Sequence, residues 1–148
     1  MIQIRQVQPE DMFAVMKLAH DTLPERYHTT LFNTFYETTP QGFLVATRYH
    51  SIVGFLIGIK IDLSHAKIVM LGVKPDHRRQ GIGAQLVSHF VHICIEDQVA
   101  TIDLEVNTSN TSAQQFYQKQ GFVITDTLSQ FYENGDDALS MTKDLLAN

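Results

Sequence analysis

The residue types most suited to chemistry lie in one short segment, between residues 74 and 83. Lys74, Arg78 and Arg79 supply three of the eleven lysines and arginines of the chain. Gly81 and Gly83 follow, and a residue without a Cβ atom lets backbone N–H groups approach a ligand. Free N–H groups at a helix N-terminus attract anions. The segment therefore indicates a phosphate site, although a basic turn before a glycine-rich helix start would show the same pattern.

Two common phosphate-binding motifs are absent from this segment. The sequence has no G-x-x-x-x-G-K-[ST] pattern, which argues against a nucleotide P-loop. The dinucleotide fingerprint needs a third glycine, and Gln85 and Leu86 stand where that glycine would fall. If the segment binds phosphates, it does so with a different motif.

Hydrophobic periodicity predicts the elements that position this segment. Strands are expected around residues 2–4 and at residues 42–48, 51–63, 67–73, 101–106, 122–125 and 138–143. Helices are expected between Pro9 and Leu23 and at residues 31–36, 81–97 and 110–120. Three strands in the middle read as an antiparallel meander, whereas strands separated by helices need crossovers, so part of the sheet should be parallel. We therefore predict one α/β domain over residues 1–148, with a mixed central sheet flanked by helices.

Composition limits the classes of partner. The net charge of −5 argues against a general nucleic-acid binder, because neutralising phosphates requires a basic face. The longest apolar run, residues 52–59, is too short to span a bilayer, and the first eight residues do not resemble a signal peptide. A single cysteine, Cys94, agrees with a reducing compartment. We expect a cytoplasmic protein that binds neither nucleic acid nor membrane.

Two other features carry little chemistry. His89 and His92 lie three residues apart on a predicted helix, but no acid or cysteine nearby completes a ligand set, so we expect no metal. Cys94 lies among apolar residues of the same helix, which favours burial over reactivity.

Four segments, taken in order, resemble one family. Arg78-Arg79-Gln80-Gly81-Ile82-Gly83 resembles the Arg/Gln-x-x-Gly-x-Gly/Ala loop of the GNAT acetyltransferases. Leu104-Glu105-Val106, followed by Asn110, Ala113, Tyr117, Gly121 and Phe122, resembles the last strand-helix unit of that family. Residues 131–138 resemble the aromatic-Tyr-x-x-Gly-x-Asp-Ala segment of the ribosomal-protein alanine and archaeal N-terminal acetyltransferases. Residues 23–27 resemble the Leu-Pro-Glu-x-Tyr segment of protein N-terminal acetyltransferases. Phe131 departs from the pattern, because relatives often carry a second tyrosine there.

The resemblance covers nearly the whole chain and implies acetyl-CoA as co-substrate. Backbone amides of the glycine loop would hold its pyrophosphate, and Leu71 and Val73 would flank its pantetheine arm. The residues that the resemblance places at the co-substrate are Leu71, Val73, Arg78, Arg79, Gln80, Gly81, Ile82, Gly83, Ala84, Asn110 and Tyr117. An oxyanion would meet a backbone N–H of the strand at residues 67–73.

The resemblance also implies roles in direct acetyl transfer, which needs no covalent enzyme intermediate. Tyr117 would be the general acid, since a phenol with a pKa of about 10 can protonate a departing thiolate. Glu105 would be the general base through a water molecule, with Glu25 as the second candidate. Without the resemblance, Tyr117 reads as a packed aromatic residue and both glutamates as ordinary surface carboxylates.

The acceptor is the least determined part of the prediction. By resemblance, Leu23, Glu25, Tyr27 and Tyr132 would line a groove for a protein or peptide N-terminus, such as that of a ribosomal protein. An α-amino group with a pKa near ~8 is easier to deprotonate than lysine, near ~10.4. A small amine, a lysine side chain, or a non-catalytic acyl-CoA-binding role are the alternatives.

Overall fold

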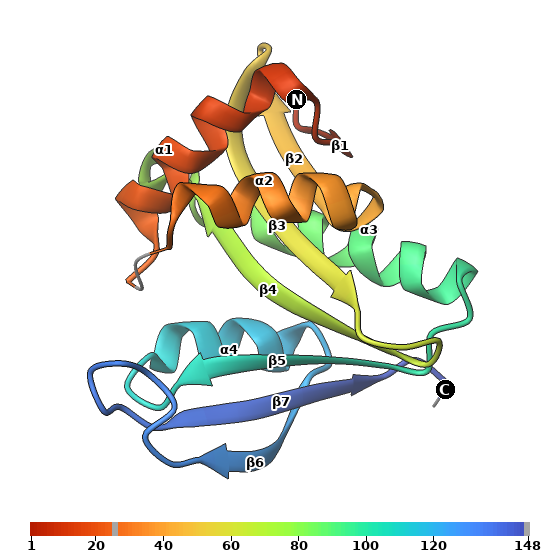
Figure 1. Cartoon of the computed structure of the whole chain (residues 1–148), viewed down its shortest axis with the longest axis vertical. Coiled ribbons are helices and arrows are strands. Elements are labelled where there is room, and N and C mark those ends of the chain that lie inside the picture. Colours follow the sequence, from red (N-terminus) through yellow and green to blue (C-terminus); the bar gives the residue numbers. More distant parts are fainter. Residues whose placement is uncertain (25–26, 147–148) are drawn as a thin grey trace.

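The computed structural model describes residues 1–24 and 27–146 (Figure 1). The strands are β1 (Gln3–Gln6), β2 (Phe43–Arg48), β3 (Ser51–Lys60), β4 (His65–Val73), β5 (Thr101–Asn107), β6 (Val123–Leu128) and β7 (Ala138–Asp144). The helices are α1 (Met12–Thr22), α2 (Thr29–Thr38), α3 (Ile82–Glu96) and α4 (Thr111–Lys119). Three short 3₁₀ turns are η1 (Pro9–Asp11), η2 (Pro40–Gly42) and η3 (Pro75–His77). The predicted order of strands and helices is confirmed.

All seven strands form one sheet in the order β1-β2-β3-β4-β5-β7-β6. The pair formed by β4 and β5 is parallel, and the other neighbouring strands are antiparallel. The prediction of a mixed sheet is therefore confirmed. The single parallel pair follows from α3, which carries the chain from the end of β4 back to the start of β5.

Helices cover both faces of the sheet and bury a separate core on each. Helices α1 and α2 cross one face of β2, β3 and β4 (Figure 1), where Val15 and Phe32 pack against Phe43 and Phe55. Helices α3 and α4 pack on the other face, around a larger core that reaches from β2 to β7. This second core includes Leu44, Leu56, Leu86, Phe90, Ile102, Leu104, Tyr117 and Met141. At its centre, a Cβ atom on Gly58 would overlap the ring of Phe90, so a glycine lets α3 approach β3 closely.

The most consequential feature of the sheet is a fork between its two halves. Strands β4 and β5 pair only where residues 65–67 face residues 101–103. Beyond that point they diverge, as Figure 1 shows, while β5 continues to pair with β7 along its whole length. Among the described residues, no strand pairs with the edge of β4 from residue 68 to 73 on this side. The fork is therefore a gap in the hydrogen-bonded ladder, bordered by the edges of β4 and β5.

A bulge lies in β4 beside the fork. Met70 pairs with Ile57 and Ile68 pairs with Gly58, so Val69 is an extra residue in the ladder. A bulge shifts the alternation of side chains by one position. Accordingly Ile68 lies in the core under α3, whereas Met70 lies in the core under α1 and α2.

The predicted strand boundaries differ most from the structure at β3 and β6. Strand β3 ends at Lys60 rather than Leu63, because the carboxylate of Asp62 accepts hydrogen bonds from the backbone N–H groups of Ser64 and His65 and forms the turn. Strand β6 continues to Leu128, three residues past the predicted end. Its residues are mostly exposed, so hydrophobic alternation gives little signal there.

The start of α1 is tied to β1 by an ion pair. The guanidinium of Arg5 donates hydrogen bonds of 2.6 and 3.0 Å to the carboxylate of Asp11, and the backbone N–H of Gln8 donates one of 2.8 Å. Asp11 is buried, and the bond from Arg5 lowers the pKa of its carboxyl group below the usual range.

In the described part of the chain, no helix combines the length and apolar character needed to cross a membrane.

Candidate active site

A cleft of about 920 Å³ lies between the end of β4, the start of α3 and helix α4. Its lining includes every residue that the sequence analysis placed at the co-substrate, except Gln80. The side chain of Gln80 instead accepts a hydrogen bond of 3.0 Å from Arg48, at the end of β2. Gln80 thus belongs to the basic loop, while its side chain contacts Arg48 outside the lining of the cleft, and its contact with the co-substrate stays a prediction.

The basic loop at residues 78–81 has the backbone shape of an anion site. Gly81 has a φ of 78° and precedes the first turn of α3, while Arg79 has a φ of 63°. A Cβ atom on Gly81 would meet no atom within 4 Å, so the left-handed backbone, not a lack of space, requires glycine here. The guanidinium of Arg78 donates a 3.2 Å hydrogen bond to the Val73 carbonyl, which fixes its stem beside the cleft. Both arginines are exposed, and the N–H groups of the first turn of α3 face the same loop.

Helix α4 forms the opposite wall and supplies cleft residues that the sequence analysis missed. Ser112, Gln115, Phe116, Lys119 and Gln120 line the cleft together with Ala113 and Tyr117. They recur at helical spacing, so a helical-wheel reading of residues 110–120 would have found them. Lys119 adds a cation to a wall that faces the two arginines across the cleft. Asn110 also lines the cleft, but its side-chain oxygen accepts the N–H of Ala113 at 3.0 Å and so caps α4.

Tyr117 lies at the inner part of this wall and is 9% exposed. Its ring packs edge to face against Phe116 and Phe122, with centroids 5.0 and 5.7 Å apart. Burial raises the pKa of the Tyr117 phenol well above its usual value, because the phenolate would lose its hydration. The hydroxyl group therefore keeps its proton over the whole physiological range and can act only as a donor of that proton.

Cys94 is a buried residue of α3 whose thiol is a weak acid. Its side chain packs in the core, and burial raises the pKa of the thiol to about 12. A thiolate is therefore scarce at neutral pH, and the residue does not line the cleft. Cys94 is a core residue, as its neighbours in the sequence predict.

Glu105 lies on β5 at the fork, facing away from the cleft. Leu104 and Val106, its neighbours, point into the core under α3 and α4, so Glu105 points to the opposite face of the sheet. Its carboxylate forms an ion pair of 2.6 Å with the ammonium of Lys67, which comes from β4. The two side chains are 17% and 28% exposed, so the pair is partly solvated. The sequence analysis did not select Lys67, because only the register of β4 against β5 brings it to Glu105.

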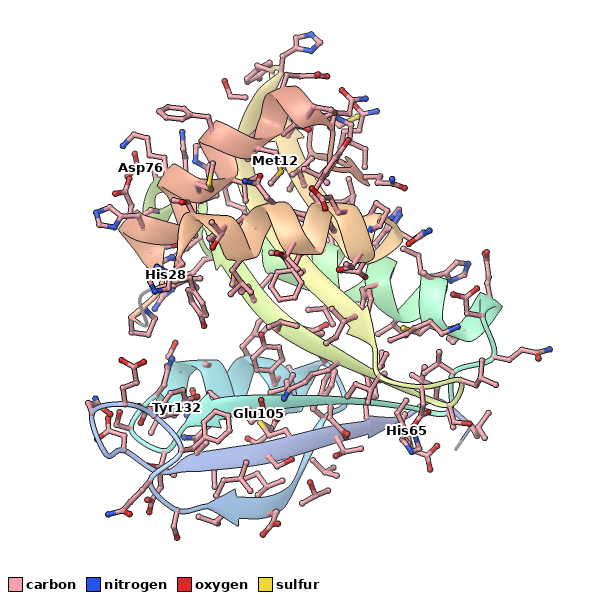
Figure 2. All side chains as sticks on the ribbon, viewed as in Figure 1. Met12, His28, His65, Asp76, Glu105 and Tyr132 are labelled. Carbon is pink, nitrogen blue, oxygen red and sulfur yellow. The ribbon has the colours of Figure 1, made fainter. Side chains whose placement is uncertain are left out.

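The predicted acceptor residues border the same face of the sheet. Leu23 and Tyr27 line a hollow of about 300 Å³ between α1 and α2, together with Met16, His20 and Phe32. Glu25, the second candidate base, lies outside the described residues. Tyr132 lies in the β6–β7 loop, and Figure 2 shows Tyr132 and Glu105 on the side of the fork opposite His28, which follows Tyr27.

Hydrogen bonds hold the β6–β7 loop against β5. The backbone N–H of Tyr132 donates to the carbonyl of Asp136 at 3.1 Å, and the Asn107 side chain donates to the Asp136 carboxylate at 2.9 Å. The ring of Phe131 packs edge to face on Tyr132. This loop is therefore fixed at the carboxyl end of β5, two residues past Glu105. Among the described residues, no group of three or more histidine, cysteine, aspartate or glutamate side chains is placed to hold a metal.

Known proteins share both this fold and this sequence pattern. The profile of the Acetyltransferase (GNAT) family matches residues 12–122. N-alpha-acetyltransferase 30 from Xenopus laevis is 33% identical over 88% of this chain, which spans 49% of that relative's length. Ard1 from Thermoplasma volcanium has a TM-score of 0.94 at 34% identity, covering 99% of both chains. Naa50 from Arabidopsis thaliana, in complex with the bisubstrate analogue CoA-Ac-MVNAL, has a TM-score of 0.84 at 26% identity, covering 97% of this chain and 98% of that one.

The chain belongs to the GNAT acetyltransferase family, because the family profile spans most of its length and its fold matches throughout. It is an acetyltransferase whose co-substrate is acetyl-CoA. The residues that line the cleft fit this co-substrate, independently of the comparison with relatives. It offers a glycine loop at a helix N-terminus, with two arginines on that side and a lysine on the facing wall, for the phosphates.

Proposed function

We propose that this chain transfers the acetyl group of acetyl-CoA to the α-amino group of protein N-termini. The observation that carries the proposal is the fork. The co-substrate cleft lies on one face of the sheet, and Glu105 stands at the opening on the other face. Leu23 and Tyr27 border that second face on one side and Tyr132 on the other, so an extended peptide end would reach the fork between them. The relatives with N-terminal acetyltransferase names support this class of acceptor.

The roles of the co-substrate residues follow from the cleft. The backbone N–H groups at residues 81–83 and the side chains of Arg78 and Arg79 bind the pyrophosphate, because they concentrate positive charge at a helix start. Leu71 and Val73, on the unpaired edge of β4, flank the pantetheine arm. We assign the oxyanion of the tetrahedral intermediate to a backbone N–H on the β4 edge at the fork, where the bulge at Val69 interrupts the regular ladder with β3.

Two side chains move the protons in the proposed reaction. The neutral amine attacks the thioester carbonyl carbon, and its surplus proton passes to the Glu105 carboxylate through a water molecule. Collapse of the intermediate breaks the C–S bond, and Tyr117 donates its proton to the departing sulfur of CoA. Glu105 then releases its proton to solvent and Tyr117 recovers one, which restores both groups. No residue is acylated, in keeping with the buried thiol of Cys94.

A panel of acceptors tests the proposal. Release of free CoA thiol is measured with peptides that begin Ala, Ser, Met-Glu and Met-Leu, a lysine peptide with a blocked N-terminus, and spermidine. We expect turnover only with peptides that have a free N-terminus. Turnover confined to spermidine or to the blocked lysine peptide would keep the chemistry and overturn the acceptor.

The cellular compartment is part of the same proposal. We place the enzyme in the cytoplasm, where nascent and ribosomal proteins present their N-termini and where the unpaired thiol of Cys94 stays reduced. An N-terminal peptide from a ribosomal protein, added to the panel, tests whether that class of acceptor is preferred over unrelated sequences.

A further inference from the structure

Lys67 holds a position that the reaction, as proposed above, does not explain. It lies in β4 at the last residue that pairs with β5, so its side chain emerges where the fork begins. Its neighbours Ala66 and Ile68 point into the core under α3, which sends Lys67 to the acceptor face. In the ladder Lys67 faces Asp103, yet its ammonium binds Glu105 two residues further along.

Asp103 does not compete for this ammonium in the structure. The hydroxyl group of Thr142 donates a hydrogen bond of 2.7 Å to the Asp103 carboxylate, and Thr142 itself lies 3.2 Å from the hydroxyl of Thr125. A chain of polar contacts thus runs from β6 through β7 to Asp103. Lys67 therefore pairs with Glu105, the proposed general base.

This pair sets a condition on the acceptor. A lone carboxylate at the fork would attract the ammonium form of an N-terminus, which has no lone pair and cannot attack a thioester. Because Lys67 already neutralises Glu105, a second ammonium would gain little from the carboxylate and would be repelled by Lys67. A neutral amine meets no such repulsion and can still pass its proton to the carboxylate.

We propose that Lys67 is a specificity-determining residue that makes the acceptor site select the neutral amine over its ammonium form. The inference rests on the proposed role of Glu105. It adds that the site discriminates between the charged and the neutral form of the acceptor amine. Lys67 acts on the acceptor partly through Glu105 and is not itself a proton acceptor or donor in the reaction.

An isosteric pair of peptide caps measures this selection without any turnover. One peptide carries trimethylated glycine at its N-terminus, (CH₃)₃N⁺–CH₂–CO–, and the other carries the neutral cap (CH₃)₃C–CH₂–CO–. Binding of each is measured by calorimetry with saturating CoA present. Because the caps have the same shape, the ratio of the two dissociation constants reports the charge together with its desolvation, and the desolvation of the free peptides cancels when a variant is compared with the wild type.

The wild-type protein should bind the neutral cap more tightly than the charged one. In Lys67→Gln the ratio should move about tenfold toward the charged cap, an effect of the size expected for a partly exposed ion pair. Lys67→Arg keeps the cation and should keep the wild-type ratio. The double variant Lys67→Gln/Glu105→Gln should lose the part of the gain that comes from the freed carboxylate and keep only the part that comes from relieving the repulsion by Lys67.

An unchanged ratio in Lys67→Gln, with CoA affinity and melting temperature as in the wild type, would overturn the inference. A failure of the proposed function looks different, since the wild type would then release thiol with no free-N-terminus peptide. If a small amine is turned over instead, the two ligands are its quaternary ammonium derivative and the neutral compound with carbon in place of that nitrogen. The ratio of their dissociation constants in the wild type and in Lys67→Gln then tests the inference.

Discussion

At the scale of single residues, burial decides what each acidic group can do. Tyr117 is held in its protonated form because its ring is enclosed by Phe116 and Phe122. Tyr117→Phe should lower the turnover number roughly 10²-fold or more, as expected for the loss of a general acid, and should leave the dissociation constant of acetyl-CoA unchanged. Steady-state kinetics and equilibrium binding check both parts. Unchanged turnover would remove Tyr117 from the mechanism.

The raised pKa also predicts that the wild type shows no loss of activity from Tyr117 ionisation up to about pH 10.

A second residue-scale prediction concerns stability. The pKa of Asp11 is lowered in the folded state by the bond from Arg5, so the ionised form stabilises the fold. This contribution is fully present above the unfolded value of about 3.8 and is lost as the pH falls through the lower folded value. Asp11→Asn should therefore reduce the free energy of unfolding by roughly 1–2 kcal/mol at about pH 7, and by less at about pH 3. Urea denaturation measures it. Asp21→Asn, in an exposed pair with Lys17, is the control and should change little.

At the scale of elements, the start of α3 combines a helix terminus with a left-handed residue. Gly81→Val introduces backbone strain of roughly 1–2 kcal/mol at a position where the space around the new Cβ atom is open, because no atom lies within 4 Å of it. The loop should relax away from its ligand-binding shape, and the dissociation constant of acetyl-CoA should rise about tenfold or more. Gly135→Val is the matched control. Gly135 has a φ of 90° and equally open space, but lies in the β6–β7 loop. Equal acetyl-CoA affinity in both variants and the wild type would place the phosphates elsewhere.

At the scale of the whole molecule, we expect the co-substrate to contact elements on both sides of the fork. The cleft is lined from β4 and α3 on one side and from α4 on the other. Acetyl-CoA at about 100 times its dissociation constant should stabilise the fold by roughly 2.7 kcal/mol, which raises the melting temperature by several degrees. Acetyl-pantetheine, which lacks the phosphates, should shift it much less. A thermal scan compares the two, and equal shifts would mean that the basic loop contributes nothing to binding.

How far the sequence predicts the molecule depends on whether a feature is local. The strand and helix order follows from periodicity, and the loop at residues 78–83 follows from its glycines and cations. Lys67 could not be predicted, because residues 67 and 105 become partners only through the register of two strands at the edge of the fork. The contact of Gln80 with Arg48 could not be predicted for a similar reason, since Arg48 lies 32 residues earlier in the chain. The α4 wall was missed although the signal was present, because only Ala113 and Tyr117 matched the family pattern.

The fork also bears on solubility. Strand edges without partners are where β-proteins add strands from other chains and aggregate, and natural sheets protect such edges. Here the unpaired edge of β4 faces inward across the cleft, between α3 and α4, rather than outward to other molecules. The outer edge, β6, carries a register shift around Thr125 and a charge at Asp126, both of which discourage pairing. The unpaired edge of β4 is thus covered within the fold and the edge of β6 is irregular and charged, so neither offers neighbouring molecules a regular template for fibril growth.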